Sequence, residues 1–172
     1  RSFTNAKNHL FLIEVFERIA SEDEDARLLL VGDGPLIDTI KCLVQNKGLF
    51  EKIIFPGAKS NLSEWYCIMD VFVFPSLFEG FGNAAVEAQA AGLSVISSDK
   101  VPASVDLTGN VLFLPLEAGV DIWAHKIMET KGKPLDYDSY IKIQNSEYGI
   151  SNASEEMMSF YHGIMEDDEE IR

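Results

Sequence analysis

The sequence has little cysteine and no long apolar run. Its two cysteines, Cys42 and Cys67, are far apart among 172 residues, which excludes a disulfide framework or a cysteine-based metal site. We interpret both as small core residues of a protein in a reducing compartment. No run of 18 apolar residues is present, so no membrane span is predicted. The chain begins at Arg1 with neither a methionine nor a signal peptide, and we therefore expect it to be part of a longer protein.

Positively charged residues are also scarce. The chain has 14 Lys and Arg against 28 Asp and Glu, which gives a net charge of −14. This balance argues against a nucleic acid partner, because phosphate backbones are bound by Lys and Arg. Much of the acid lies in residues 21–25 and 166–170, and we expect both runs to be solvated surface. A local basic pocket is still compatible with the overall charge.

Several common catalytic motifs are absent. There is no GxxxxGK[ST] P-loop, and Gly32–Pro35 lacks the third glycine of the dinucleotide fingerprint. Ser76 does not stand in a GxSxG hydrolase motif. The histidines, His9, His125 and His162, have no carboxylates at ligand spacing. We therefore predict no metal site and interpret all three as surface or helix residues.

Short apolar strands alternate with helical patterns along the chain. Strands are predicted at 27–31, 52–55, 71–74, 93–98 and 111–114, and helices at 8–20, 35–47, 61–68, 84–91, 101–107 and 121–129. This alternation predicts an α/β fold with a doubly wound parallel sheet, covered by helices on both faces. A sixth strand is expected to precede residue 1.

The length is that of one domain. We expect residues 1–130 to form the α/β core and residues 131–172 to form a linker followed by C-terminal helices at 139–144 and 153–165. Ligands of doubly wound sheets bind at the carboxyl ends of the strands. The loops at those ends are therefore the candidate site.

The loop between the strand at 71–74 and the next helix is the strongest candidate. It contains Glu79, Gly80, Phe81, Gly82 and Asn83. Backbone N–H groups at a helix start bind anions, and glycine lets a ligand approach the backbone closely. The pattern therefore predicts a site for a phosphate or a sugar hydroxyl.

Four charged residues could complete this site, and each has a simpler alternative. Glu79 is a lone charge between apolar runs, although it could cap a neighbouring turn. Glu87 lies on an Ala-rich helix and needs a partner such as ribose hydroxyls, although it could be a surface residue near the positive helix end. Lys7 and Arg1 could bind a diphosphate, or they could be surface cations.

These residues resemble a known family. The segment Glu79–Gly–Phe–Gly–x–x–x–x–Glu87, preceded by Phe74–Pro–Ser and followed by Ala88–x–Ala–x–Gly92, is similar to the signature of the retaining GT-B glycosyltransferases of family 4, the glycosyl transferases group 1. Val31–Gly–Asp–Gly–Pro35, Ile54–Phe–x–Gly57 and Lys7–Asn8 match its upstream landmarks. The resemblance covers about residues 1–115, the donor-binding half, and the terminal helices resemble those of bacterial capsule and exopolysaccharide transferases.

The resemblance implies a role for each residue. Glu79 would contact the donor sugar, Glu87 would hold the ribose, and Lys7 with Arg1 would stabilise the diphosphate leaving group without a metal. Backbone groups would also bind the donor, with Gly57 near the base. They would belong to Gly80, Phe81, Gly82, Asn83, Gly34 and Gly57.

The implied function is transfer of a sugar from a nucleotide-diphosphate sugar, expected to be UDP-linked, to a saccharide or lipid-linked acceptor in surface polysaccharide synthesis. No cofactor is expected. The acceptor site and any membrane contact would belong to an N-terminal domain absent from this chain, which alone should bind donor weakly and transfer little. We expect a cytoplasmic protein, free or peripheral at the inner face of the membrane. Two alternatives stay open: a sugar-nucleotide epimerase on the same fold, and a non-catalytic α/β interaction domain.

Overall fold

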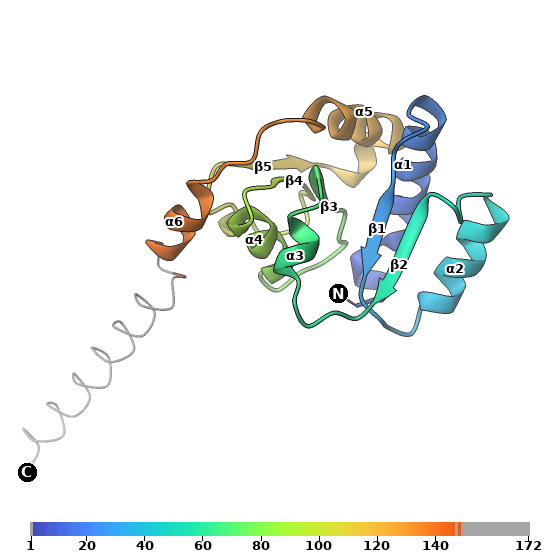
Figure 1. Ribbon diagram of the computed structural model, residues 1–172, viewed down its shortest axis with the longest axis horizontal. Coiled ribbons are helices and arrows are strands. Elements are labelled where there is room, and N and C mark those ends of the chain that lie inside the picture. The colour runs from blue at the N-terminus through green and yellow to red at the C-terminus, as the bar shows by residue number, and fades with distance from the viewer. Residues whose placement is uncertain (1, 147, 149–172) are drawn as a thin grey trace, which may run out of the picture.

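The computed structural model describes residues 2–146 and 148. Its strands are β1 (Leu28–Val31), β2 (Ile53–Gly57), β3 (Val71–Phe74), β4 (Ser94–Ser98) and β5 (Val111–Leu114). Its α-helices are α1 (His9–Glu22), α2 (Ile37–Asn46), α3 (Ser63–Tyr66), α4 (Asn83–Ala90), α5 (Val120–Thr130) and α6 (Ser139–Gln144), and short 3₁₀ turns are η1 (Asn5–Lys7), η2 (Ala103–Val105) and η3 (Leu116–Ala118). Every strand pair is parallel, which confirms the predicted α/β class (Figure 1).

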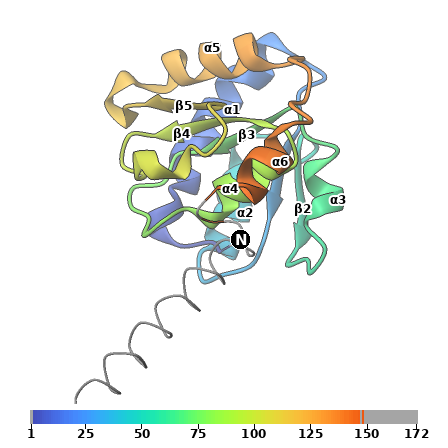
Figure 2. The ribbon, with the colours of Figure 1, turned by 90° about the vertical axis from the view of Figure 1, so that its left-hand side faces the viewer.

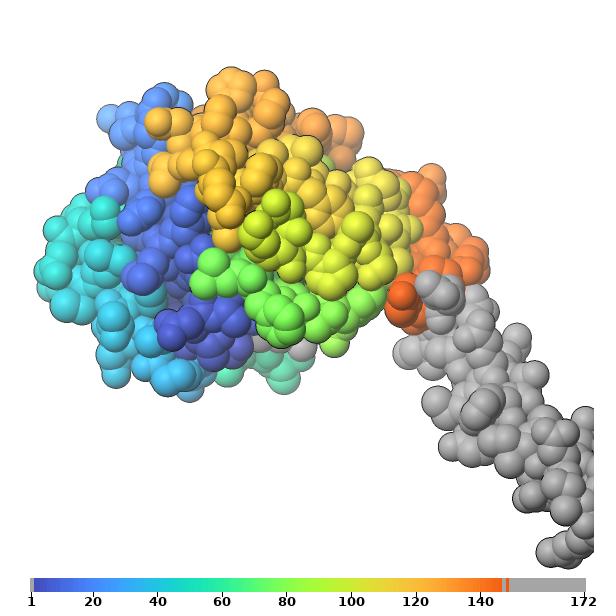
Figure 3. Space-filling model, turned by 180° about the vertical axis from the view of Figure 1, so that it is seen from behind, coloured from blue at the N-terminus to red at the C-terminus, as the bar shows by residue number. Residues whose placement is uncertain are grey.

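Helices cover both faces of the strands. On β4, Ile96 packs with Trp123 of α5 and Val15 of α1, whereas the adjacent Val95 packs with Ala88 of α4. Because successive strand residues point to opposite faces, α1 and α5 lie on one face and α4 lies on the other. Figure 3 shows α1 and α5 side by side on the outer surface. The doubly wound arrangement is thus confirmed.

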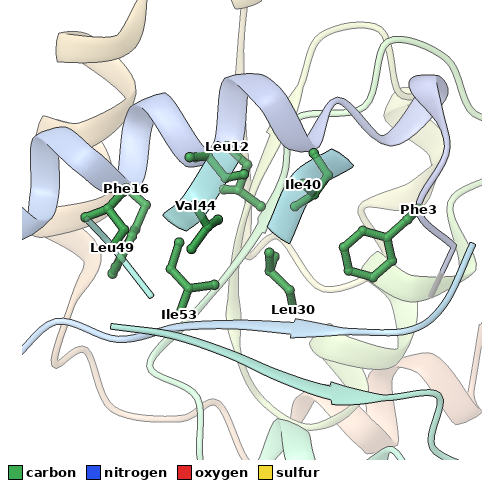
Figure 4. Close-up of a cluster of buried hydrophobic side chains, with 9 residues drawn as sticks. Phe3, Leu12, Phe16, Leu30, Ile40, Val44, Leu49 and Ile53 are labelled. Atoms are coloured by element: carbon green, nitrogen blue, oxygen red, sulfur yellow. The ribbon is translucent and has the colours of Figure 1, made fainter. Parts of the chain in front are cut away.

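A cluster of buried side chains fixes the N-terminal segment on the end of β1. It joins α1, α2, β1 and β2 (Figure 4) and consists of Phe3, Leu12, Ile13, Phe16, Leu30, Ile40, Val44, Leu49 and Ile53. Phe3 is 1% exposed, its N–H donates to Asp33 O at 3.0 Å, and its carbonyl accepts from Leu36 N–H at 3.1 Å. The segment that leads to Lys7 is therefore anchored on the loop after β1.

The structure differs from the expected single sheet. The hydrogen bonds form two sheets, β1–β2 and β3–β4–β5, because no described strand lies between β1 and β3. The helix expected at 61–68 is only the short α3, and residues 101–107 contain the 3₁₀ turn η2. Strand β2 continues through Pro56 to Gly57, which is tolerated because β2 is an edge strand.

The assignment of both cysteines to the core was wrong. Cys42 and Cys67 are exposed. Ile40 and Val44 face the core from α2, and Cys42, two residues from each, lies on the opposite side of that helix. Cys67 follows the buried Tyr66 at the end of α3 and points away from it.

The acidic run at 21–25 is largely exposed, as predicted, and its half-buried member Asp23 pairs with Lys131. No helix among residues 2–146 and 148 is long and apolar enough to cross a membrane. After α5, residues 131–138 lead to α6, which lies beside α4 (Figure 2). The predicted helix at 153–165 and the acidic run at 166–170 lie outside the described residues, and the division at residue 130 stays a prediction.

Candidate functional site

The loops at the carboxyl ends of β1 and β3 meet at the N-terminal segment. Leu77 N–H, in the loop after β3, donates to Ala6 O at 2.8 Å, and Phe3 bonds to the loop after β1. Ligands of doubly wound folds bind at this edge. The observed loop cluster therefore includes two of the loops that the sequence indicates.

An ion pair lies at the centre of this cluster. Lys7 Nζ is 2.5 Å from Glu79 Oε1, and the Ser76 hydroxyl donates to the same oxygen at 2.7 Å. The Glu79 side chain is 11% exposed and that of Lys7 is 25% exposed. Lys7 Nζ also lies 5.2 Å from the centroid of the Phe74 ring, a cation–π distance. Two residues that are 72 positions apart in the sequence thus form one polar unit that is largely shielded from solvent.

Sequence reasoning missed Ser76 as a site residue. Its side chain is fully buried, and its carbonyl accepts a hydrogen bond from the Ser98 hydroxyl at the end of β4. Ser76 therefore fixes Glu79 to the sheet. A polar residue two positions after the apolar strand β3 was the available signal for this role.

The loop from Glu79 to Asn83 ends at the first residue of α4. Gly82 has φ +99°, and a Cβ there would lie 3.3 Å from side-chain atoms of Phe74 and Val105, so this turn requires glycine. No side chain from residues 2–146 or 148 caps the N-terminus of α4. Its first N–H groups are therefore oriented toward the same edge as Lys7. Gly80 and Asn83 are exposed.

The remaining member of the loop, Phe81, is half-buried. Its ring lies against Tyr148, with centroids 4.8 Å apart and planes inclined by 30°. This contact joins the loop to the segment that follows α6. It leaves the Phe81 backbone, rather than its ring, as the group that could contact a ligand.

Glu87 lies one turn into α4, facing α3. Tyr66 Oη donates to Glu87 Oε2 at 3.1 Å and lies 3.4 Å from Ala84 O. Glu87 is half-buried, so the alternative of a simple surface residue is not supported. Tyr66, interpreted from sequence only as a helix residue, positions this carboxylate.

One cavity of about 830 Å³ opens along this edge. Its polar end is lined by Ser2, Lys7, His9, Glu79, Phe81, Gly82 and Asn83, and Tyr66 lies on its wall. The predicted residues Gly34, Gly57, Gly80 and Glu87 do not line it. Arg1 is outside the described residues.

Gly34 and Gly57 both have backbones that favour glycine. Gly57 has φ +77° with open space around it, and its carbonyl accepts from Gly32 N–H at 3.0 Å. Gly34 has φ +154°, and a Cβ there would lie 2.6 Å from Phe3 N. The structure therefore gives Gly34 a packing role at the N-terminal segment.

Substitution Gly34→Ala is expected to lower the free energy of unfolding by about 1–3 kcal/mol, because it adds a backbone clash to an unfavourable φ. Gly48→Ala is the matched control: Gly48 also has positive φ, but nothing lies within 4 Å of the added Cβ. Urea unfolding measures both variants. Equal losses would show that the contact with Phe3 has no energetic weight.

His9 is the first residue of α1, which fits its interpretation as a surface or helix residue, and it is half-buried. Its ring stacks on Phe3 with centroids 4.3 Å apart, and its Nδ1 is buried without a hydrogen-bond partner among residues 2–146 and 148. Burial, followed by nearby positive charge including that of Lys7, lowers the pKa of His9 to about 4. A neutral imidazole therefore lies beside the Lys7–Glu79 pair at pH 7.

Within the described part of the chain, no three His, Cys, Asp or Glu side chains gather where they could hold a metal ion. Among residues 2–146 and 148, the positive groups at this edge are Lys7 and the N-terminus of α4. The site can therefore bind an anion through a fixed ammonium and backbone N–H groups, with a carboxylate adjacent to it.

Comparison with known proteins finds several relatives of this chain. The chain is 33% identical over 148 residues to the putative glycosyltransferase EpsF of Bacillus subtilis, covering 86% of this chain and 38% of EpsF. It is 26% identical over 169 residues to the capsular polysaccharide biosynthesis glycosyltransferase CapM of Staphylococcus aureus, covering 92% of this chain and 43% of CapM. The chain thus spans less than half the length of either relative.

A solved structure shows the same fold. A mutant of S. aureus TarM, in complex with fondaparinux, α-GlcNAc-glycerol and UDP, superposes with a TM-score of 0.78 at 19% identity, covering 91% of this chain and 33% of TarM. This likeness is one of fold. The family model of glycosyl transferases group 1 matches residues 1–130. The chain therefore belongs to the glycosyl transferases group 1 family.

Proposed function

We propose that this chain is the donor-binding domain of a retaining GT-B glycosyltransferase of family 4. The full-length enzyme would move a sugar from a UDP-sugar to a saccharide or lipid-linked acceptor during surface polysaccharide synthesis in the bacterial cytoplasm. The observation that carries this proposal is the Lys7–Glu79 pair beside the start of α4. The acceptor site would belong to the rest of the protein.

Lys7 would bind the diphosphate of the donor. Its ammonium is a compact positive charge, and a diphosphate beside it would also approach the first N–H groups of α4. In the structure described here Glu79 balances that charge. A bound diphosphate would therefore compete with Glu79 for Lys7 and stabilise negative charge on the leaving group as the glycosidic bond breaks.

Glu79 would act on the sugar side. Ser76 holds one of its oxygens, so the carboxylate is oriented before a donor binds. It could accept hydrogen bonds from sugar hydroxyls and stabilise the positive charge that develops on the sugar ring in the transition state. In this proposal, Lys7 and Glu79 would provide opposite charges at the two ends of the glycosidic bond that breaks.

The identity of the nucleotide and of the product is inferred from the named relatives. UDP is favoured by its presence in the TarM complex, and capsule-type synthesis is favoured by the name of CapM. Gly57, at the carboxyl end of β2, would lie near the base. No metal ion is needed in this scheme, because Lys7 and α4 supply positive charge.

We predict that Glu87→Ala weakens UDP binding by about 10–100-fold, because a carboxylate that accepts ribose hydroxyls contributes about 1.5–3 kcal/mol. Isothermal titration with UDP, GDP and ADP measures this loss. Glu51→Gln, an exposed carboxylate in the turn before β2, is the control and should bind as the parent protein does. Unchanged UDP affinity in Glu87→Ala would remove Glu87 from the ribose site.

Transfer can be separated from the epimerase alternative with the full-length protein. Incubation with radiolabelled UDP-glucose or UDP-N-acetylglucosamine, with and without a lipid-linked saccharide acceptor, should give labelled product only when acceptor is present. Conversion of the sugar without acceptor would contradict transfer and favour epimerisation. An interaction domain without catalytic function would give neither product nor nucleotide binding.

A further inference from the structure

The chain that follows α5 runs along α4 from one end of that helix to the other. We call residues 131–146 together with Tyr148 the strap. Its helix α6 packs beside α4 (Figure 2). At the carboxyl end of α4, Asp136 N–H donates to Gly92 O at 3.0 Å, and at the amino end Tyr148 lies against Phe81. The strap therefore contacts the chain just before and just after the helix that carries Glu87.

The first anchor of the strap is at Asp136. Its carboxylate accepts hydrogen bonds from Lys142 Nζ and Asn110 Nδ2, both at 2.8 Å. Gly92 has φ +83°, and a Cβ there would lie 3.0 Å from Asp136 O, so this close approach requires glycine. Ser139, the first residue of α6, is fully buried, and its hydroxyl oxygen accepts from Asn110 Nδ2 at 3.3 Å. These contacts fix the start of α6 on the domain.

The second anchor of the strap is the contact between Tyr148 and Phe81. The Ser146 hydroxyl donates to Ile143 O at 2.7 Å and accepts from Tyr148 N–H at 3.3 Å, so a turn closes the end of α6. The Tyr148 ring lies 4.8 Å from the Phe81 ring between centroids, with the planes inclined by 30°. Phe81 lines the cavity, whereas Tyr148 is 43% exposed and does not line it. Tyr148 therefore contacts the loop from outside the cavity.

Phe81 lies between two glycines, which makes its ring important for the shape of the loop. An added Cβ at Gly80 would have nothing within 4 Å, so that residue is not confined by its neighbours. Glycine gives the backbone more freedom than any other residue. The Gly82 carbonyl accepts from Ala85 N–H at 2.8 Å and so forms part of the first turn of α4. A contact that fixes the Phe81 ring therefore also restricts the backbone that leads into this turn.

We propose that Tyr148 is a positioning residue that holds the glycine loop and the first turn of α4 through the Phe81 ring. Its effect on donor binding rests on the function proposed above, in which this loop and α4 receive the diphosphate. Aromatic pairs contribute an energy that corresponds to a factor of about 3–10 in an equilibrium constant. The strap thus couples the segment after α6 to the donor site, and a change in the strap alters donor affinity without altering the cavity lining.

Amide hydrogen exchange by NMR on the full-length protein tests whether Tyr148 holds the loop, and it needs no ligand. Tyr148→Ala should speed exchange of Ala85 N–H by about 3–10-fold. Leu93 N–H, which bonds to Ala88 O at the other end of α4, should change much less. Tyr148→Phe keeps the ring and should match the parent protein. Tyr140→Ala removes an exposed tyrosine from the same strap and is the matched control.

Isothermal titration with UDP tests the consequence for the donor site. Tyr148→Ala should weaken UDP binding by about 3–10-fold, whereas Tyr148→Phe and Tyr140→Ala should bind as the parent protein does. The free energy of unfolding is measured for each variant, because a merely structural role would lower it without changing the affinity of the folded protein. In a Phe81→Leu background, where the ring partner is absent, Tyr148→Ala should cause no further loss of affinity.

Equal acceleration of exchange at Ala85 and Leu93 would overturn the proposal, because Tyr148 would then stabilise the whole domain rather than the loop. Faster exchange at Ala85 with unchanged UDP affinity would overturn the coupling to the donor site. Equal losses from Tyr148→Ala in the parent and Phe81→Leu backgrounds would show that Tyr148 acts through another contact. A parent protein that binds none of UDP, GDP and ADP would contradict the proposed function instead, and the exchange rates would still decide whether Tyr148 holds the loop.

Discussion

Replacement Glu79→Gln in the full-length protein is expected to lower the rate of sugar transfer by about 10²–10³-fold, the scale for loss of one preorganised group in a transition state. The amide keeps an oxygen that accepts from the Ser76 hydroxyl, so the loop should keep its position. It removes the negative charge that would face the sugar ring. The loss should therefore appear in kcat, with a smaller effect on the affinity for UDP.

The measurement is release of UDP from donor in the presence of acceptor, followed under single-turnover conditions. Glu14→Gln, which changes an exposed carboxylate on α1, is the matched control and should react at the parent rate. A Glu79→Gln enzyme with normal kcat would show that the buried carboxylate only positions Lys7. In that case its role would be structural.

Replacement Lys7→Met is expected to lower transfer by a similar factor of about 10²–10³, and also to weaken UDP binding, because a diphosphate carries its charge before and after the bond breaks. Lys126→Met, which removes a lysine of α5 whose side chain is 41% exposed, serves as control. The Lys7→Met change leaves the Glu79 side chain, which is 11% exposed, without its ion-pair partner. Its free energy of unfolding must therefore be measured alongside its activity.

The double variant Lys7→Met/Glu79→Gln separates catalytic from structural effects. If the two residues act on opposite ends of the same bond, each single change already removes most of the rate of transfer. The fold loss of rate in the double variant should therefore be smaller than the product of the two single fold losses. Unfolding free energy should recover part of its loss when both charges are absent. A double variant that recovers transfer activity would contradict roles for the pair in the reaction.

The glycine loop shows how far local sequence can go. Gly82 before an Ala-rich segment predicted a loop followed by a helix, and α4 begins at Asn83. The family followed from the spacing of Glu79 and Glu87. Neither observation could show that Lys7 bonds to Glu79, because that contact spans 72 residues and depends on how the N-terminal segment lies on β1 and β3.

Residue type alone gives the wrong expectation of burial at His9, Cys42 and Ser76. Polar residues are usually exposed and cysteine is usually buried, yet Ser76 is fully buried, His9 is half-buried, and Cys42 is exposed. Their exposure depends on helix phase and on neighbours that are distant in sequence. Tyr66 is similar, since its contact with Glu87 requires α3 to pack beside α4.

By itself the sequence determined the α/β class, the alternation of strands and helices, and the loop that carries the candidate site, because these depend on apolar periodicity and on glycine, which act over a few residues. Only the tertiary structure decided that Lys7, Ser76 and Glu79 form one polar unit, that Tyr66 holds Glu87, and that the described strands divide into two sheets. Those features depend on long-range packing and on which backbone edges find a partner. No local pattern in the sequence encodes long-range packing or the pairing of strand edges.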